Sequence, residues 1–362
     1  MKVATSTKPT IKTGAQDLAL EIDGGQMSGS GTILRLAVAI AAIRAQPIHI
    51  FNIRRNRPEP GLKPQHLRAV LTAAKMCNAE LEGAFLNSRE IWFRPHEIQG
   101  GKIRADIGTA GSIPMLLITV LPMCLFAKNP MRLTVTGGTD TAHSPTISYL
   151  KHVLLTKLKQ MGFEAEITVN KYGYYPKGGG EVTLTATPKV HLQPLELKSF
   201  GTVKSVKGIS ICTFLAEGKV AERQVKAARD YLSEKGYTAD IQIVNDRSNP
   251  FQKGSSIALW AETTTGAILG ADAIGELGKT SETVGRKAAA NLHRELSAKA
   301  TVDVHLADML IPYVCLAQGT SVFFTRELTD HLKTNIWLSE RMLNLRFNVQ
   351  MVNGLYRVER CD

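Results

Sequence analysis

Apolar residues recur along the chain with two spacings, one typical of helices and one typical of strands. The helical spacing predicts helices at residues 32–45, 65–77, 113–126, 147–161, 220–235, 283–296, 302–317 and 332–343. Alternation or short apolar runs predict strands at residues 18–22, 48–53, 80–82, 90–94, 103–106, 131–136, 165–170, 181–187, 203–214, 239–244, 256–264, 322–325, 346–352 and 355–359. The last two strands flank Asn353-Gly354, a dipeptide that favours a tight hairpin.

Two of the predicted helices, at residues 32–45 and 113–126, are apolar on most of their faces. Such helices are usually buried, because no polar face remains for water. The second contains Pro114 and Pro122 and is too short to span a bilayer comfortably. We therefore expect a buried helix and no membrane association.

The predicted elements follow a rhythm of strand, helix, strand, helix, strand, strand, which recurs without any repeat of the residues themselves. This rhythm predicts an α+β fold, layered in the α/β manner, with helices on one face of each sheet. Pro188 and Pro194 interrupt regular structure and indicate a connector. The elements between residues 203 and 264 then form a plausible inserted subdomain.

The charge balance changes the expected partner. Lysine and arginine number 44 against 32 aspartates and glutamates, a formal net charge of +12. This excess favours an anionic partner, of which nucleic acid is the commonest, although an enzyme that is merely basic is the alternative.

The cysteines and the N-terminus bear on the compartment. The five cysteines lie far apart and form no Cys-x-x-Cys pair, which argues against a zinc site or a disulfide framework and favours a reducing cytoplasm. Residues 1–17 are polar and lack the apolar core of a signal peptide. We expect them to form a mobile N-terminal tail.

Three loops combine residue types that bind phosphates or bases. Residues 23–31 carry four glycines between a strand and a helix, although no Gly-Lys-Ser/Thr ends the run as in a Walker A loop. Residues 53–67 gather Arg54, Arg55, Arg57 and Lys63 among prolines, a stiff basic loop suited to gripping an anion. Residues 174–180 place two tyrosines beside Lys177 and three glycines. The alternatives are a flexible turn, a solvated basic loop and a tight turn between strands.

Two single residues are further candidates. Asp308 is a lone carboxylate in an apolar helical context, and a metal ion is one partner that such a group can take. His331 lies just before an apolar helix, and a histidine ring nitrogen can attack phosphorus to give a phosphoramidate. A helix-surface aspartate and an ordinary surface or capping histidine are the alternatives.

In this order and spacing, the motifs resemble the RNA 3'-terminal phosphate cyclase family over about residues 18–358. The matching segments are residues 57–67 (RPEPGLKPQHL), 108–112 (GTAGS), 137–140 (GGTD), 174–180 (YYPKGGG) and 306–308 (LAD). The run GLKPQH at residues 61–66 is the most specific.

The resemblance implies repeated βαβαββ units that form a large domain, here residues 18–193 and 291–362, with a smaller α/β domain inserted at residues 194–290. It also implies a ligase-class enzyme with nucleotidyl-transfer chemistry, using ATP and Mg²⁺ or Mn²⁺. The catalytic histidine attacks ATP, AMP passes to an RNA 3'-phosphate, and the neighbouring 2'-hydroxyl closes a 2',3'-cyclic phosphate.

Carried onto this sequence, the resemblance implies a role for each of twelve residues. His331 is the nucleophile and Asp308 the metal ligand. The adenosine pocket is formed by His305, Leu306, Ala307, Asp308, Met309 and Pro145. The phosphates or RNA are bound by Arg35, Arg54, Arg57, Lys63 and Gln65.

The sequence departs from the family pattern at four positions in the expected ATP site. Ser28 and Thr32 stand where the first glycine loop usually has glutamate and glutamine, and Ile118 and Met309 replace two further glutamines. Two other functions therefore stay open. One is a non-catalytic, cyclase-like RNA-binding factor in ribosomal RNA processing, and the other is a transferase on a small anionic substrate with the related enolpyruvyl-transferase architecture. The oligomeric state stays undetermined.

Overall fold

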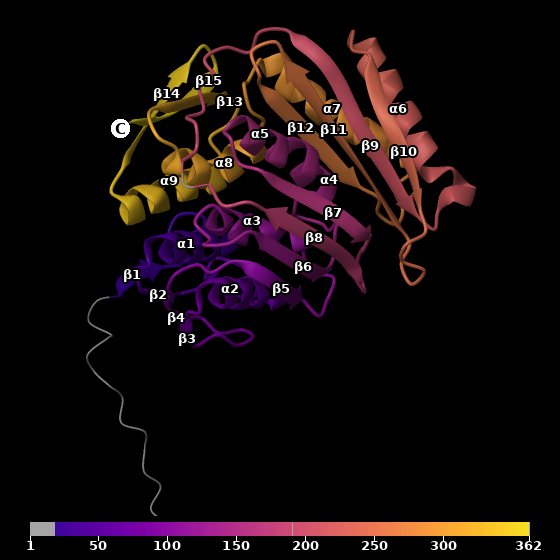
Figure 1. Cartoon of the computed structure of the whole chain (residues 1–362). Helices are drawn as coiled ribbons and strands as arrows, with labels where there is room; N and C mark the ends of the chain where they lie inside the picture. Colours follow the sequence, from indigo (N-terminus) through magenta and orange to yellow (C-terminus); the bar gives the residue numbers. More distant parts are fainter. Residues whose placement is uncertain (1–18, 190, 362) are drawn as a thin grey trace, which may run out of the picture.

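The computed structural model describes residues 19–189 and 191–361. The predicted tail at residues 1–17 lies outside these residues. The α+β prediction is confirmed, because helices and mixed sheets alternate through the described chain. Figure 1 shows the N-terminal part in indigo, the C-terminal part in yellow and the inserted part in salmon to orange.

The first two units have the same order of elements and the same sheet topology. The first consists of β1 (Leu20–Asp23), α1 (Gly31–Arg44), β2 (Ile48–Phe51), α2 (Pro64–Cys77), β3 (Glu80–Glu82) and β4 (Ile91–Arg94). The second consists of β5 (Gly101–Asp106), α3 (Ile113–Cys124), β6 (Met131–Gly137), a helical segment, β7 (Ala165–Lys171) and β8 (Gly180–Ala186). Their sheets run β1-β2-β4-β3 and β5-β6-β8-β7, and only the first pair of each is parallel. Both units are therefore βαβαββ.

A third unit of this kind is split by the insertion. Its later elements are α8 (Val304–Leu316), β13 (Ser321–Thr325), α9 (Asp330–Leu343), β14 (Arg346–Val352) and β15 (Leu355–Cys361), with sheet order β13-β15-β14. The place of its first strand is taken by the chain around Glu196, which bridges Val322 in parallel. Val322 N–H donates to the Leu195 carbonyl at 2.6 Å, and Leu197 N–H donates to the Val322 carbonyl at 2.9 Å.

The inserted part has its own sheet and its own core. It consists of β9 (Val203–Thr213), η2 (Ala216–Gly218), α6 (Val220–Glu234), β10 (Ala239–Asp246), β11 (Gly254–Thr263), β12 (Ile268–Ile274) and α7 (Ser281–Ala298), with sheet order β10-β9-β11-β12. α6 and α7 pack against each other and against this sheet. α7 continues past residue 290, and its Leu292 and Leu296 belong to this second core.

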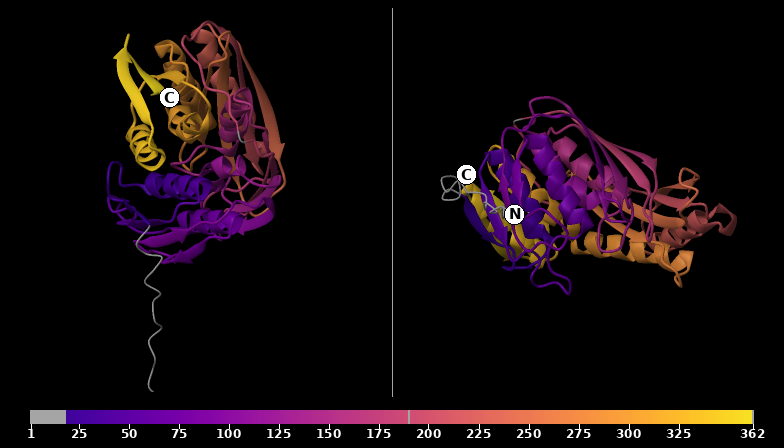
Figure 2. Two further views of the ribbon diagram at one scale, coloured as in Figure 1. Left: turned by 60° about the vertical axis from the view of Figure 1, so that its left-hand side comes forward. Right: turned by 90° about the horizontal axis from the view of Figure 1, so that it is seen from below.

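The helices of the three units meet in the middle of the large domain. α1 packs against α2, α3 and α9, and α8 packs against α9 and α3. Both views in Figure 2 place the C-terminal unit beside the N-terminal one. This packing buries α1 on most of its faces and α3 likewise, as the sequence predicts. Among the described residues, no helix combines the length and the apolar character needed to cross a bilayer.

Two sequence predictions of secondary structure need correction. The segment predicted as one helix at residues 147–161 contains a π-helical stretch, η1 (Leu150–Leu154), between α4 (Ile147–Tyr149) and α5 (Leu155–Gln160). Strand β12 was not predicted. Its residues are covered by α7 on one side and approached by Tyr149 and Val153 at Gly270, so they lack the alternation that marks a half-buried strand.

Candidate active site

A cavity of about 510 Å³ lies where the helices of the three units meet the inserted part. Its walls come from α1, α3, α8, α9, the segment around Tyr149 and strand β12. The side chains that line it are Thr32, Arg35, Leu36, Ala39, Arg57, Met115, Ile118, Pro122, His143, Ser144, Pro145, Tyr149, Asp272, His305, Asp308, Met309, Pro312, His331 and Asn335. The cavity therefore combines an apolar part with cationic, carboxylate and histidine side chains.

His331 lies in the first turn of α9 rather than just before the helix. The helix begins earlier than its apolar pattern indicates, because the Thr329 hydroxyl caps it by accepting from Leu332 N–H at 2.9 Å. Nδ1 of His331 lies 3.0 Å from the Thr32 hydroxyl of α1. Nε2 makes no hydrogen bond with another described residue, so this nitrogen is the one available to a ligand.

The electrostatic surroundings keep the His331 imidazole neutral. Burial lowers its pKa, and the positive charges of Arg35 and Arg57 lower it further. A neutral imidazole retains a ring lone pair, which is the form that attacks an electrophile or binds a metal.

Arg35 and Arg57 bring positive charge to the cavity beside this histidine, and Arg54 lies near Arg35 without lining the cavity. Burial together with the charges of Arg54 and Arg57 lowers the pKa of Arg35 to about 10. The Arg54 guanidinium is held by the carbonyls of Glu59 and Gly61, each at 2.8 Å. The Arg57 side chain makes no hydrogen bond within the described chain and faces the cavity. Uncompensated guanidinium groups at one place form a site for an anion such as a phosphate.

Lys63 and Gln65 lie near this cationic group but are engaged elsewhere, and neither side chain lines the cavity. Lys63 pairs with Glu59 at 2.8 Å and donates to Asn87 at 3.1 Å. The Gln65 side-chain oxygen accepts from Ser112 N–H at 2.8 Å. Gln65 thereby joins the basic loop to the segment Gly108–Ser112.

Asp308 presents a carboxylate to the cavity from α8. Burial raises its pKa to about 7, and the Thr329 hydroxyl donates to its Oδ1 at 2.6 Å. The backbone carbonyl of Asp308 accepts from the Asn335 side chain at 2.7 Å. These contacts connect the carboxylate to the start of α9, which carries His331.

The side chains in the cavity could bind a divalent cation only if the phosphates of a bound substrate supplied further ligands. In the described chain, no three His, Cys, Asp or Glu side chains form a metal-binding group. The lining holds two carboxylates, Asp308 and Asp272, and each accepts a hydrogen bond from a described residue on one of its oxygens. Mg²⁺ is commonly held by one or two carboxylates together with substrate phosphates, and this donor set suits such an arrangement.

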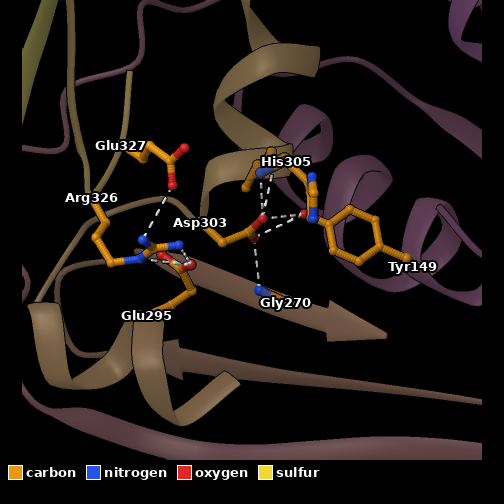
Figure 3. A network of polar contacts seen from close by, with 8 residues as sticks. Tyr149, Gly270, Glu295, Asp303, His305, Arg326 and Glu327 are labelled. Carbon is orange, nitrogen blue, oxygen red and sulfur yellow. Dashed lines mark hydrogen bonds and ion pairs between the residues drawn. The ribbon is translucent and has the colours of Figure 1, made fainter. Parts of the chain in front are cut away.

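The Asp303 carboxylate fixes the start of α8 beside the cavity (Figure 3). Its Oδ1 accepts from His305 N–H and Leu306 N–H, both at 3.0 Å. The Tyr149 hydroxyl donates to Oδ1 at 2.7 Å, and Gly270 N–H donates to Oδ2 at 2.8 Å. One buried side chain thus joins α8, α4 and β12, so the insertion helps to position the cavity wall.

The other predicted pocket residues divide into two groups. His305, Met309 and Pro145 line the cavity, and His305 is exposed to solvent. Leu306 and Ala307 lie in the hydrophobic core with no exposed surface. They point away from the cavity because successive residues of a helix face different sides.

Sequence reasoning missed Asp272, Tyr149 and His143 as cavity residues. Asp272 lies on β12, and its Oδ2 accepts from Thr146 N–H at 2.6 Å. Burial raises the pKa of Asp272. An acid isolated in an apolar run, as in residues 268–274 (ILGADAI), was the available signal, but the run itself was not recognised as a strand.

Comparison with known proteins bears on the whole chain. A family model described as RNA 3'-terminal phosphate cyclase matches residues 26–349. The chain belongs to this family. Similar proteins named RNA 3'-terminal phosphate cyclase occur in Methanosarcina barkeri (45% identical, covering 94% of this chain and 99% of the relative) and Pyrobaculum aerophilum (42% identical, 94% and 98%). A third, from Pyrococcus furiosus, is 44% identical and covers 91% of this chain and 94% of the relative.

The departures from the cyclase family pattern take definite places in the structure. Thr32, Ile118 and Met309 line the cavity, so three of the four substitutions change its walls. Thr32 contacts the histidine directly. Ser28 is outside the lining, where its N–H donates to the Thr334 hydroxyl at 3.2 Å and its side chain meets Ser30 at 3.0 Å.

The loop at residues 174–180, shared with the cyclase family, is also outside the cavity. The Thr213 hydroxyl of the insertion donates to the buried Tyr174 hydroxyl at 3.3 Å, and the side chain of Asn249 donates to the Gly178 carbonyl at 3.3 Å. The loop therefore joins the second unit to the insertion.

Proposed function

We propose that this chain adenylylates itself on His331 with ATP and then converts an RNA 3'-terminal phosphate to a 2',3'-cyclic phosphate. The observation that carries the proposal is the position of His331, which lines one cavity together with Arg35 and Arg57. Burial of the ring and the charges of these two arginines lower the pKa of the histidine. A lone pair next to cationic phosphate-binding groups suits nucleophilic attack on a phosphorus atom.

In the first step, Nε2 of His331 attacks the α-phosphorus of ATP. A nitrogen–phosphorus bond forms and the bond to the bridging oxygen breaks, so pyrophosphate leaves. In the proposed tautomer, the Thr32 hydroxyl accepts a hydrogen bond from Nδ1–H and so orients the ring. Arg35 and Arg57 stabilise the negative charge that develops on the phosphate oxygens.

In the second step, an oxygen of the RNA 3'-phosphate attacks the phosphorus of the histidine-bound AMP. The nitrogen–phosphorus bond breaks, which frees His331 and leaves the RNA end joined to AMP. The adjacent 2'-hydroxyl then attacks the RNA phosphorus, loses its proton and expels AMP. Adenylylation is needed because an unactivated phosphate monoester has no good leaving group for this ring closure.

Asp308 would hold a divalent cation, Mg²⁺ or Mn²⁺, together with the substrate phosphates. Such a cation neutralises phosphate charge. The neighbouring walls would hold the nucleoside. His305, Pro145 and Met309 line this part of the cavity, where the histidine would stack on the base and the other two would supply apolar contact.

The test is transfer of label from α-labelled ATP to the protein without RNA. The wild type should acquire acid-labile, alkali-stable label in the presence of Mg²⁺ or Mn²⁺, as expected for a phosphoramidate. His331→Asn should acquire none. His293→Asn is the matched control, since His293 lies on α7 and contacts only Ser297 through hydrogen bonds.

Absence of label from a folded wild-type protein would contradict the proposal. If that protein still bound RNA, the non-catalytic cyclase-like factor would become the better description. If it bound neither RNA nor ATP, a transferase on a small anionic substrate would be favoured. Label on both histidine variants would instead place the nucleophile elsewhere.

A further inference from the structure

Two aromatic side chains are exposed at one end of the molecule, away from the cavity lining. Tyr175 is 81% exposed and Phe251 is 79% exposed, the highest values among the aromatic residues that the structure describes. Tyr175 lies in the β7–β8 connection and Phe251 in the β10–β11 connection. Figure 1 places both connections at its lower right. Exposed apolar side chains that gather in one place mark an interaction site, whereas exposed apolar side chains that are scattered singly do not.

The two connections are fastened to each other. The buried side chain of Asn249 donates to the Tyr172 carbonyl at 2.8 Å and to the Gly178 carbonyl at 3.3 Å. Ser248 accepts from Tyr172 N–H at 3.3 Å. Since both loops share this base, the exposed rings are held on one surface rather than on independent flexible loops.

Three cations stand beside these rings. Lys177, Arg247 and Lys253 are exposed and make no ion pair or hydrogen bond with another described residue. The nearby carboxylate of Asp246 is used internally, because it accepts from Thr213 at 2.9 Å and from Ser248 N–H at 3.1 Å. Glu181, at the start of β8, accepts from Asn170 at 3.0 Å. The surface therefore retains positive charge.

The surface adjoins the segment Gly108–Ser112, whose first two residues are exposed and which leads back toward the cavity. A Cβ added at Gly178 would lie 2.8 Å from Ala110 Cα and 2.9 Å from the Thr109 carbonyl, so these chains are in close contact. Ser112, in the same segment, donates a hydrogen bond from its N–H to the side-chain oxygen of Gln65. Gln65 precedes His66, whose ring lies against Gly31 beside Arg35. A polymer end bound at Arg35 could thus continue along Gly108–Ser112 to the exposed rings.

We propose that Tyr175, Lys177, Arg247, Phe251 and Lys253, here called the two-loop patch, bind single-stranded RNA that leads away from the reacting 3' end. Bases stack on the two rings, and the three cations contact phosphates. A strand with free bases fits because stacking needs an open base face, which a duplex hides. This inference rests on the proposed function, since it assumes that the cavity receives the RNA end.

The experiment compares binding of two fluorescent oligouridylates that end in a 3'-phosphate. One has about 12 nucleotides and is chosen to extend from the cavity to the two-loop patch, and one has about 3 nucleotides and is chosen to fill the cavity alone. Fluorescence anisotropy is measured with the wild type and with Tyr175→Ala plus Phe251→Ala. Phe85→Ala is the matched control, because Phe85 is 63% exposed in the first unit.

The double variant should bind the longer RNA at least about tenfold more weakly, while its affinity for the short RNA stays unchanged. Lys177→Gln plus Lys253→Gln should reduce the salt dependence of binding to the longer RNA alone. Phe251→Tyr should retain wild-type affinity because it keeps an aromatic face. Unchanged affinity of the double variant for the longer RNA, or equal losses for both RNAs, would overturn the proposal.

Self-adenylylation without RNA separates this inference from the proposed function. The double variant should label as the wild type does, because its substitutions lie outside the cavity. Loss of long-RNA affinity in a protein whose wild type shows no label would support the two-loop patch and contradict the proposed chemistry. Wild-type labelling of the double variant with unchanged affinity for the longer RNA would support the proposed chemistry and contradict the two-loop patch.

Discussion

The Thr32 hydroxyl lies 3.0 Å from Nδ1 of His331, although the two residues are 299 positions apart in the sequence. Arg35 donates to the same hydroxyl oxygen at 3.3 Å. Because a guanidinium can only donate, the oxygen acts as an acceptor there, and it can also accept from a protonated Nδ1. In that tautomer the lone pair of the ring lies on Nε2, as the proposed attack requires. Thr32, one of the four departures from the family pattern, is thus hydrogen-bonded to the proposed nucleophile.

Replacing Thr32 with valine should slow self-adenylylation about tenfold, because the ring loses the hydrogen bond that orients it. Thr32→Ser should restore the rate, which a purely packing role would not predict. Thr119→Val is the control, since Thr119 is also a buried helical threonine and bonds only within its own helix. Equal rates for Thr32→Val and Thr119→Val would show that the contact has no role in the reaction.

Replacing Arg35 with glutamine should raise the pKa of His331. The positive charge of Arg35 disfavours the imidazolium, so its removal makes protonation easier. The acid limb of the self-adenylylation profile should therefore move to higher pH. Histidine titration by NMR measures the pKa directly. Arg44→Gln, at the other end of the same helix, should leave it unchanged, and a shift in both variants would contradict the explanation.

Replacing Asp308 with asparagine should stabilise the protein at neutral pH while abolishing its labelling by ATP. Burial raises the pKa of Asp308 in the folded state to about 7, above the ordinary value of 3.8. Between these values the unfolded chain binds fewer protons, so wild-type stability falls as pH rises. Asparagine avoids this loss and can still accept from Thr329.

The gain from Asp308→Asn should be near zero at pH 4 and on the order of 2 kcal/mol at pH 8. Urea unfolding at the two pH values measures it. Asp230→Asn is the control, because Asp230 is exposed and pairs with Lys226 on the surface of α6. If the gain in the free energy of unfolding did not depend on pH, the pKa of Asp308 in the folded state would not be raised by burial.

Replacing Gly31 with alanine should impair the site although alanine is the better helix former. A Cβ at this position would lie 2.3 Å from His66 Nε2 and 2.8 Å from an Arg35 nitrogen. One or both side chains must move, which disturbs the phosphate-binding group and destabilises the fold by roughly 1–3 kcal/mol.

Equilibrium binding of ATP and thermal unfolding together measure the effect of Gly31→Ala. Gly218→Ala is the control, since the nearest atom to its added Cβ is a Val220 methyl at 3.6 Å. If Gly31→Ala kept the wild-type affinity for ATP and the wild-type stability, the side chains of His66 and Arg35 would be able to move aside without affecting the site or the fold.

The sequence by itself predicted most helices and strands, because hydrophobic period is a local property that each element carries in its own residues. The sequence also contains the glycine and arginine motifs on which the resemblance to the family rests. Its apolar runs predicted that α1 and α3 are buried. Strand β12 and the π-helical stretch escaped prediction. β12 is covered by α7 and approached by Tyr149, and the π-helical stretch packs against α8 and β12. Both elements therefore depend on neighbours that are distant in the chain.

Only the tertiary structure decided which of these residues meet. It brought Thr32 to His331 and Asp272 into the cavity, and it turned Leu306 and Ala307 into the core. It also placed residues 174–180 against the insertion instead of the cavity. The physical reason is that the cavity forms between helices of three separate units and a strand of the insertion. Their relative positions follow from side-chain packing, which no local pattern records.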